Sequence, residues 1–327
     1  MQRNLVFSED TEGDGKMRVP ILGGAGDVGR HLIGDLSQNG YEVTVLDRAS
    51  AVPEIAENRS ITYLQADITN RALVNQAVQG KDVIIHSAWS FADDPHIVFG
   101  EDIIGHINLL EAVSSSGVSR FIYTSTATVY GRAVFHPVTE AHPCLVGEAR
   151  KPLYGLGKHT AEELCNLYHR QRGLPTTIFR FWWAFGATIG GRHLRNIIRT
   201  SLKHEPLEIV RGAGGAFVTM ADLGKAVISA IERPDAVGQV YNLGSVFLTW
   251  EEIGEMIVRL AHSTSPVRLI PSEQWQGPPF LNEIWDLSWV KAESELSYKP
   301  KHSSEGMRSL FAEALGNCIA EVKKGAQ

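Results

Sequence analysis

Short apolar runs alternate with stretches of helical periodicity through the first half of this chain. Two of the runs, at 83–85 and 121–123, are apolar at every position, which is typical of strands covered on both faces. Alternating strands and helices predict an α/β fold with a doubly wound parallel sheet. The expected strands are 19–22, 41–47, 61–66, 82–86, 120–124 and 176–180, and the expected helices are 28–36, 69–78, 102–115 and 152–172.

The regular alternation fails after residue 186. We expect a basic helix near 192–204, a short strand at 207–210, a glycine-rich turn at 212–215 and a helix from Asp222. An apolar run at 240–243 is expected to return to the main sheet.

These patterns predict two interwoven parts. A sheet domain covers 17–186, and 215–245 partly returns to it. A smaller, mixed α/β region that binds substrate covers most of 187–327. Residues 1–16 are polar, and we expect them to be a mobile extension.

A glycine-rich turn joins the first expected strand to the first helix. Gly23, Gly26 and Gly29 are spaced three apart, and Asp47 ends the next strand. Glycines let the backbone close on a pyrophosphate at a helix N-terminus, and a carboxylate about 20 residues later can bind both ribose hydroxyls. This order of strand, turn, helix and strand predicts a dinucleotide site.

Composition and charge narrow the class of protein. The 327 residues carry a formal net charge of -6 without a dense run of Lys or Arg, which argues against nucleic acid or an anionic membrane surface as a partner. Cys144, Cys165 and Cys318 lie far apart, so we expect reduced thiols, no disulfide framework and no metal site. No apolar run reaches the roughly 18 residues that span a bilayer, and residues 1–16 lack the apolar segment of a secretory signal. We expect a cytoplasmic protein.

Tyr154 and Lys158 stand four positions apart in an expected helix, so their side chains emerge on one face. An ammonium group and a nicotinamide cation both favour the phenolate, and the pair can then act as an acid–base unit. A surface tyrosine with a solvated lysine also fits this spacing. Thr126 favours the catalytic interpretation, because it follows a buried strand at the edge where ligands of open α/β sheets bind. It could hold a substrate oxygen.

Together these features resemble the extended short-chain dehydrogenase/reductases of the NAD-dependent epimerase/dehydratase type. The resemblance covers nearly everything from Met17 to about Leu315. It implies a Rossmann fold, NAD as the cofactor and a homodimer. The matching segments are the glycine turn, Asp47, Asp67-Ile68, His86-Ser87-Ala88, 124–131, the Tyr154 and Lys158 pair, 180–186, Asp222 and 241–244.

The resemblance also implies roles for single residues. Thr126 and Tyr154 would bind the reacting oxygen, and Lys158 would also hold the nicotinamide ribose. Asp47 would repel a 2'-phosphate and favour NAD, while Arg48 beside it keeps NADP as an alternative. The expected cofactor contacts, of which Asp67 and Ile68 would flank the adenine, are Gly23, Gly26, Asp27, Val28, Gly29, Asp47, Arg48, Asp67, Ile68, Ala88 and Lys158.

Three residues depart from the family's pattern. Pro20 lies inside the first expected strand, where it cannot donate a ladder hydrogen bond, so this strand should be locally irregular. Asp27 brings a charge into the phosphate turn and should point away from the pyrophosphate. Asp102 stands where many relatives carry an asparagine, and it is expected either to organise a proton-relay water or to cap a helix.

The substrate side departs further. Relatives that act on nucleotide sugars usually have an asparagine at the position of Trp183 and an arginine near Gly215, and both are absent. Because two phosphates need charge-assisted hydrogen bonds, we expect a substrate without a nucleotide handle. The expected substrate contacts are Ser90, Thr126, Tyr154, Trp183 and Arg192, with Arg195 and Arg211 as further candidates, Trp89 and Phe91 as another wall, and Trp182 in the core.

The sequence thus predicts an NAD-dependent oxidoreductase in which Tyr154, Lys158 and Thr126 assist hydride transfer on a secondary alcohol or ketone. A sugar or sugar-like small molecule suits the family, and an aromatic alcohol would suit the tryptophans. Dehydration is disfavoured, because Ala127 and Thr128 stand where dehydrating relatives carry an acid pair. The alternatives are a nucleotide-sugar epimerase of the UDP-sugar 4-epimerase type and a catalytically idle NAD-binding regulatory protein.

Overall fold

A computed structural model describes residues 15–51, 55, 58 and 61–325 of the chain. The mobile extension expected over 1–16 lies outside these residues except for its last two, which are exposed. Among the described residues, no helix has both the length and the apolar character needed to cross a membrane.

The described residues form a parallel sheet of seven strands in the order β10-β6-β5-β4-β1-β2-β3. The run expected at 240–243 does return to this sheet, since β10 pairs with β6 in parallel. The strands are β1 (Arg18–Leu22), β2 (Glu42–Asp47), β3 (Thr62–Gln65), β4 (Val83–His86), β5 (Arg120–Thr124), β6 (Thr176–Phe181) and β10 (Gln239–Leu243).

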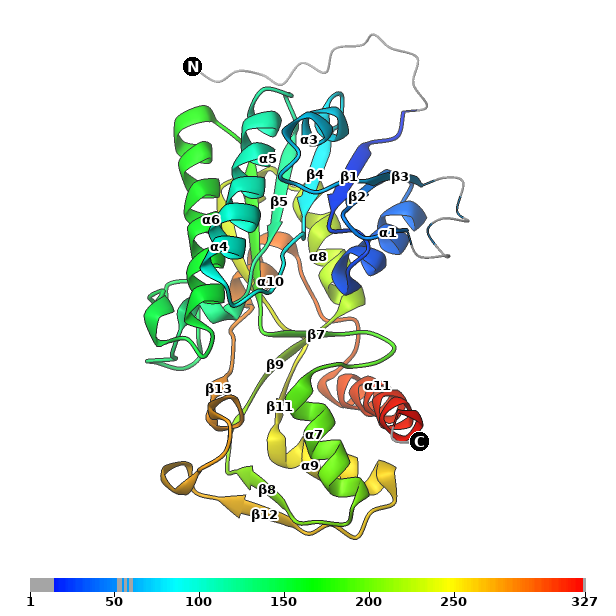
Figure 1. Cartoon of the computed structure of the whole chain (residues 1–327), viewed down its shortest axis with the longest axis vertical. Helices are drawn as coiled ribbons and strands as arrows, with labels where there is room; N and C mark the ends of the chain where they lie inside the picture. The colour runs from blue at the N-terminus through cyan, green and yellow to red at the C-terminus, as the bar shows by residue number, and fades with distance from the viewer. Residues whose placement is uncertain (1–14, 52–54, 56–57, 59–60, 326–327) are drawn as a thin grey trace.

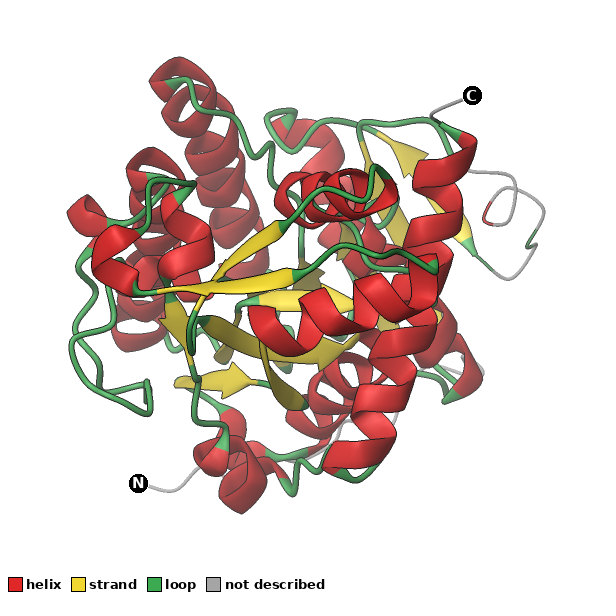
Figure 2. Ribbon diagram, turned by 90° about the horizontal axis from the view of Figure 1, so that it is seen from below, coloured by secondary structure: helices red, strands yellow, loops and turns green. Residues whose placement is uncertain are grey.

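Helices cover both faces of the sheet (Figures 1 and 2). Successive strand residues point to opposite faces, so Val19 and Ile21 of β1 join one core and Leu22 joins the other. The doubly wound α/β prediction is confirmed. The first face is covered by α1 (Asp27–Gln38), α8 (Met220–Glu232) and α10 (Val290–Leu296), and the second by α3 (Arg71–Val78), α5 (Ile104–Ser114) and α6 (Pro152–Arg172).

A smaller α/β region with its own core occupies the lower part of Figure 1. It is interwoven with the main sheet, because β9 leads directly into α8. The domain boundaries at 186 and 187 stay a prediction. The region contains a four-stranded sheet of β7 (Trp183–Phe185), β9 (Gly214–Thr219), β11 (Val246–Thr249) and β13 (Ile284–Trp285), a pair of β8 (Leu207–Val210) with β12 (Val267–Ile270), and the helices α7 (Arg192–Leu202), α9 (Trp250–Ala261) and α11 (Ser304–Lys324).

The helix expected from residue 102 begins earlier. It starts at α4 (Pro95–Ile97), continues through the π-helix η1 (Val98–Ile103) and becomes α5 only at Ile104. Asp94 is the N-cap, since its carboxylate accepts a hydrogen bond from His96 N at 2.8 Å. The capping alternative for Asp102 is therefore wrong.

Two other local predictions need adjustment. β1 pairs with β2 along its whole length, Pro20 included, whereas it pairs with β4 only from Ile21 onward. The irregularity caused by the missing proline N–H is thus confined to the β4 side. The glycine turn expected at 212–215 ends inside β9: a Cβ on Gly215 would lie 2.3 Å from the Trp182 ring, so glycine here allows close packing rather than a turn.

Candidate active site

The glycine turn packs β1 tightly against its neighbours. Gly23 has a φ of +85°, and a Cβ there would lie 2.4 Å from Ala88 N. A Cβ on Gly29 would lie 2.4 Å from Gly23 O. Gly26 differs, since its Cβ would meet only Gly23 O, at 3.4 Å, and its backbone lines a cavity at the N-terminus of α1. This open backbone fits a pyrophosphate group.

The first cavity encloses about 490 Å³ and is lined by every predicted cofactor contact except Lys158. Asp47 stands on its wall, with its two carboxylate oxygens accepting hydrogen bonds from Ala25 N and Ala49 N, each at 2.9 Å. Arg48 also lines this cavity, and its guanidinium lies 3.6 Å from the carboxylate of Glu101. The site therefore fits a dinucleotide with a free ribose 2'-hydroxyl better than one with a 2'-phosphate.

Asp27 is the first residue of α1, where the positive end of the helix dipole stabilises its negative charge. Its side chain is 80% exposed and forms an ion pair with Arg30 at 2.5 Å. A carboxylate engaged with Arg30 in solvent is compatible with the prediction that it points away from the phosphate groups.

Thr126, Tyr154 and Lys158 come together at the carboxyl end of β5. Thr126 follows the strand, caps a short 3-10 turn and shares a side-chain hydrogen bond with Tyr154. Lys158 lies one turn along α6 from Tyr154, and its Nζ donates to Thr124 O at 3.0 Å. The structure thus brings together the three residues predicted to be catalytic.

Burial controls the ionisation of this trio. Lys158 is 3% exposed, and desolvation lowers its pKa to about 7 against the opposing charges of Asp102 and Glu162. Desolvation also raises the pKa of Tyr154, which the Thr126 hydrogen bond and the charge of Arg150 only partly offset. Burial is thus the largest influence on the pKa of Tyr154 in the protein without a bound cofactor, and the predicted effect of the ammonium and the nicotinamide cation would have to offset it.

Aromatic rings cover the trio. The Trp89 ring lies 4.3 Å from Lys158 Nζ, and the Phe91 ring stacks on Tyr154 with 5.4 Å between centroids. Trp89 and Phe91 line the first cavity, whereas Thr126, Tyr154 and Lys158 line neither of the two cavities described in this section. The predicted contact of Lys158 with a ribose thus requires these rings to move.

Asp102 is buried in the π-helix and faces the loop that follows β4. Its two carboxylate oxygens accept hydrogen bonds from Ser90 N at 2.9 Å and Ser90 Oγ at 2.6 Å. Ser90, predicted as a substrate contact, therefore lies on the first cavity and is held by Asp102. Burial raises the pKa of Asp102, and the two Ser90 hydrogen bonds, followed by the charges of Lys158 and Arg48, lower it in part.

A second cavity of about 840 Å³ lies between the segment before α6, the start of α7 and the loop before β13. Its wall includes Trp183 and Arg192, two of the residues for which a substrate contact is predicted, and Phe91, which also lines the first cavity. Trp182 was expected in the core, but it also lines this cavity while stacking on Phe280 at 5.3 Å. Sequence reasoning missed Arg150, Lys151, His193, Phe280, Glu283 and Trp285, which carry no motif and meet only through the fold.

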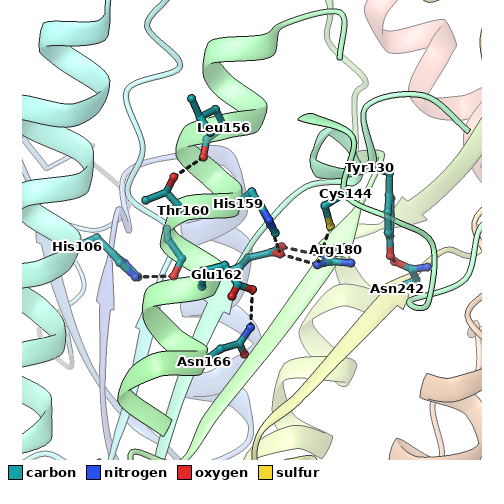
Figure 3. Close-up of polar contacts among 12 residues, drawn as sticks. His106, Tyr130, Cys144, Leu156, His159, Thr160, Glu162, Asn166, Arg180 and Asn242 are labelled. Atoms are coloured by element: carbon teal, nitrogen blue, oxygen red, sulfur yellow. Dashed lines mark hydrogen bonds and ion pairs between the residues drawn. The ribbon is translucent and has the colours of Figure 1, made fainter. Parts of the chain in front are cut away.

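A buried ion pair supports the trio from below. Glu162, one turn after Lys158, accepts hydrogen bonds from Arg180 Nε at 3.0 Å and Nη2 at 2.6 Å, and both side chains are almost fully buried. Figure 3 shows the His159 side chain pointing toward Glu162, and Cys144 next to Arg180. The pair fixes α6 against β6 and thereby the height of Lys158 above the sheet.

The described part of the chain offers no group of three or more His, Cys, Asp or Glu residues that could hold a metal ion. Cys144, Cys165 and Cys318 are free thiols.

The sequence is similar to those of known proteins. Residues 19–244 match the family model described as the NAD dependent epimerase/dehydratase family. UDP-glucuronic acid decarboxylase 1 of Danio rerio is 30% identical over an alignment of length 275 that covers 79% of this chain and 64% of that protein. A putative UDP-glucose 4-epimerase of Methanocaldococcus jannaschii is 27% identical over 69% of this chain and 76% of that protein.

Solved structures share the fold. A UDP-glucuronic acid 4-epimerase from Bacillus cereus, in complex with NAD, superposes with a TM-score of 0.75 at 23% identity, covering 94% of this chain and 99% of that one. The UDP-glucose 4-epimerase of Thermotoga maritima gives a TM-score of 0.74 at 22% identity, covering 95% of this chain and 100% of that one.

Proposed function

Because the chain belongs to the NAD-dependent epimerase/dehydratase family, we propose that it oxidises a secondary alcohol, or reduces the matching ketone, with NAD as its cofactor. The predicted Rossmann fold and NAD cofactor are those of this family. The substrate is a small molecule, and the second cavity is its site.

The chain's own residues divide the work between binding and proton transfer. The backbone at Gly26 would hold the pyrophosphate, Asp47 the adenine ribose, and Asp67 with Ile68 the adenine. When bound, NAD supplies the acceptor for the two electrons that leave the carbinol carbon. Tyr154 Oη takes the proton of the substrate hydroxyl, and in reduction it returns that proton.

Thr126 and Lys158 prepare the tyrosine for this step. Thr126 shares a hydrogen bond with Tyr154 and orients the phenol oxygen. Lys158 has a pKa of about 7. In its protonated form it can stabilise the negative charge of a Tyr154 phenolate once the rings of Trp89 and Phe91 move aside. The positive charge of a bound oxidised cofactor would lower the pKa of Tyr154 further.

One observation carries this proposal: Thr126 and Tyr154, whose side chains interact, lie beside Lys158, while Phe91 stacks on Tyr154 and lines both cavities. A panel of sugars, uronates and aromatic alcohols, each deuterated at the carbinol carbon, tests it. Deuterium should pass from one of them to NAD, as measured by mass spectrometry. If no alcohol in the panel labels the cofactor, the oxidoreductase assignment fails.

A nucleotide-sugar epimerase is a second candidate, favoured by relatives named as UDP-glucose 4-epimerase and UDP-glucuronic acid decarboxylase. The chain covers only 64% of the zebrafish relative, and Trp183 and Gly215 stand where phosphate-binding groups would be expected. Thermal-shift assays with UDP and with UDP-glucose separate the candidates, since an epimerase of this type should be stabilised by both.

We also propose a cytoplasmic homodimer. Four large apolar side chains on η1, α5 and α6 are exposed, and contact with a second copy would bury them: Phe99 (39%), Ile104 (46%), Leu156 (40%) and Leu167 (37%). The three free thiols suit a reducing compartment. Light scattering tests the dimer by comparing the molar mass of the wild type with that of Leu156→Glu. The added charge should dissociate the dimer into monomers.

A further inference from the structure

The second cavity is lined by a guanidinium that forms no ion pair within the described part of the chain. Arg150 lines the cavity and stacks on Phe280, with its Cζ 4.1 Å from the ring centroid. No described carboxylate, carbonyl or hydroxyl accepts a hydrogen bond from it, and Glu283 acts on it only through its charge. Arg150 is exposed, so its guanidinium is open to an anion that enters the cavity.

Arg150 also lies next to the proposed proton acceptor. It precedes Tyr154 by four residues, and its charge lowers the pKa of that tyrosine. An anionic group bound by Arg150 would therefore sit near the phenol oxygen. A planar guanidinium binds a carboxylate through two parallel hydrogen bonds, which suits this position.

The charges on the cavity wall favour a single negative charge. With both acids ionised, the lining groups Arg150, Lys151, Arg192, Asp93 and Glu283 leave one excess positive charge. Burial and the charges of Arg150 and Arg192 lower the pKa of His193, so it adds no charge at neutral pH. A nucleoside diphosphate brings at least two negative charges, which is more than the one excess positive charge of the wall.

The rest of the wall is flat and aromatic. Trp182 and Trp183 meet at 5.6 Å, edge to face, and Trp182 stacks on Phe280. Such rings pack against an aromatic ring or against the apolar face of a sugar ring. They offer no charge to a phosphate.

From these contacts we infer that the substrate is a hydroxy acid: a secondary alcohol whose carboxylate binds Arg150 while its ring lies against Trp182, Trp183 and Phe280. This inference rests on the proposed function, since it assigns the substrate of the same site. Arg150 is thereby a specificity-determining residue, and nothing in its role requires it to touch the cofactor.

Binding of acid and amide pairs tests the inference without any turnover. The tryptophans of the wall report on ligand through their fluorescence in the NAD-saturated protein. Phenylacetate and glucuronate should bind about 10- to 100-fold more tightly than phenylacetamide and glucuronamide, the range expected for hydrogen bonds to a charged group. Arg150→Leu should abolish this preference. Arg268→Leu, which removes an exposed arginine outside the cavity lining, should leave it unchanged.

Three results would overturn the inference: equal affinity for acids and amides, a preference retained in Arg150→Leu, or UDP binding more tightly than both carboxylates. Failure of the proposed function gives a different pattern. In that case the acids bind selectively, yet none of the alcohols in the deuterium panel labels NAD.

Discussion

The ring of Phe91 lies nearly parallel to the ring of Tyr154, at an interplanar angle of 20° and a centroid separation of 5.4 Å. Phe91 itself has a φ of +57°, a conformation that is strained for a bulky residue, and 63% of its surface is exposed. A strained residue that covers the proposed acid–base group, on the border of two cavities, is well placed to move when ligands enter.

Phe91→Gly should lower the pKa of Tyr154. Burial is the main cause that raises this pKa, and removing the ring admits water to the phenol, while glycine tolerates the positive φ. Ultraviolet difference titration of tyrosinate measures the change. The double variant Phe91→Gly with Tyr154→Phe identifies the titrating residue, and an unchanged titration would show that Phe91 does not shield it.

Gly26→Ala and Gly23→Ala form a matched pair. A Cβ on Gly26 meets only Gly23 O, so this variant should keep its melting temperature and bind NAD at least about tenfold more weakly, because the methyl group intrudes on the pyrophosphate site. Gly23→Ala should lose about 1–3 kcal/mol of stability, since its positive φ and the contact with Ala88 N both oppose a side chain. Calorimetric titration with NAD and thermal unfolding measure the two effects. Unchanged NAD affinity in Gly26→Ala would place the pyrophosphate elsewhere.

Glu162→Gln should destabilise the protein by about 3–5 kcal/mol, because it leaves the buried charge of Arg180 without its partner. Glu163→Gln is the control: it alters the adjacent, exposed glutamate and should change stability by less than about 0.5 kcal/mol. Urea unfolding measures both variants. Similar midpoints for the two would mean that the ion pair does not fix α6.

Lys158→Met should be more stable than the wild type, and the difference in the free energy of unfolding should be largest below pH 7. The lysine has a pKa of about 7 in the folded protein, whereas its pKa in the unfolded chain is about 10.4. Below pH 7 the folded wild type must bury the charged ammonium, so the cost of this burial to its stability has its highest value. Between pH 7 and 10 the folded lysine is neutral while the unfolded chain still binds the proton, so the penalty falls by up to about 1.4 kcal/mol per pH unit.

The difference in unfolding free energy between Lys158→Met and the wild type, measured from pH 6 to 10, isolates this group from all others. Lys323→Met, at an exposed position of α11, should show no such trend. A difference that stays constant with pH would contradict the assigned ionisation of Lys158.

Much of the fold could be predicted because local signals and tertiary structure agree. Pro152 at the start of α6 and Gly173 after its end, with a φ of +70°, fix that helix to the expected residues. The continuous apolar character of β5 likewise gave its bounds correctly. The helix expected from residue 102 was placed too late, because the π-helix interrupts the ordinary period and the cap at Asp94 was overlooked.

The residues of the site also fall into those that local signals predict and those that only the fold brings together. The cofactor residues follow strands in a fixed order, so their meeting at one edge of the sheet follows from the topology. Arg150 meets Phe280 across 130 residues of chain, and no periodicity connects them. The pKa of Tyr154 also escaped prediction, because the balance of burial against charge depends on the covering ring of Phe91.

The most direct test of the account compares wild type with Tyr154→Phe under saturating NAD, on whichever alcohol the deuterium panel identifies. The account predicts that turnover falls by about 10²- to 10⁴-fold, the usual contribution of a general acid–base group, while the NAD dissociation constant changes by less than about threefold. Turnover within about threefold of the wild type would show that the phenol oxygen of Tyr154 does not move the substrate proton.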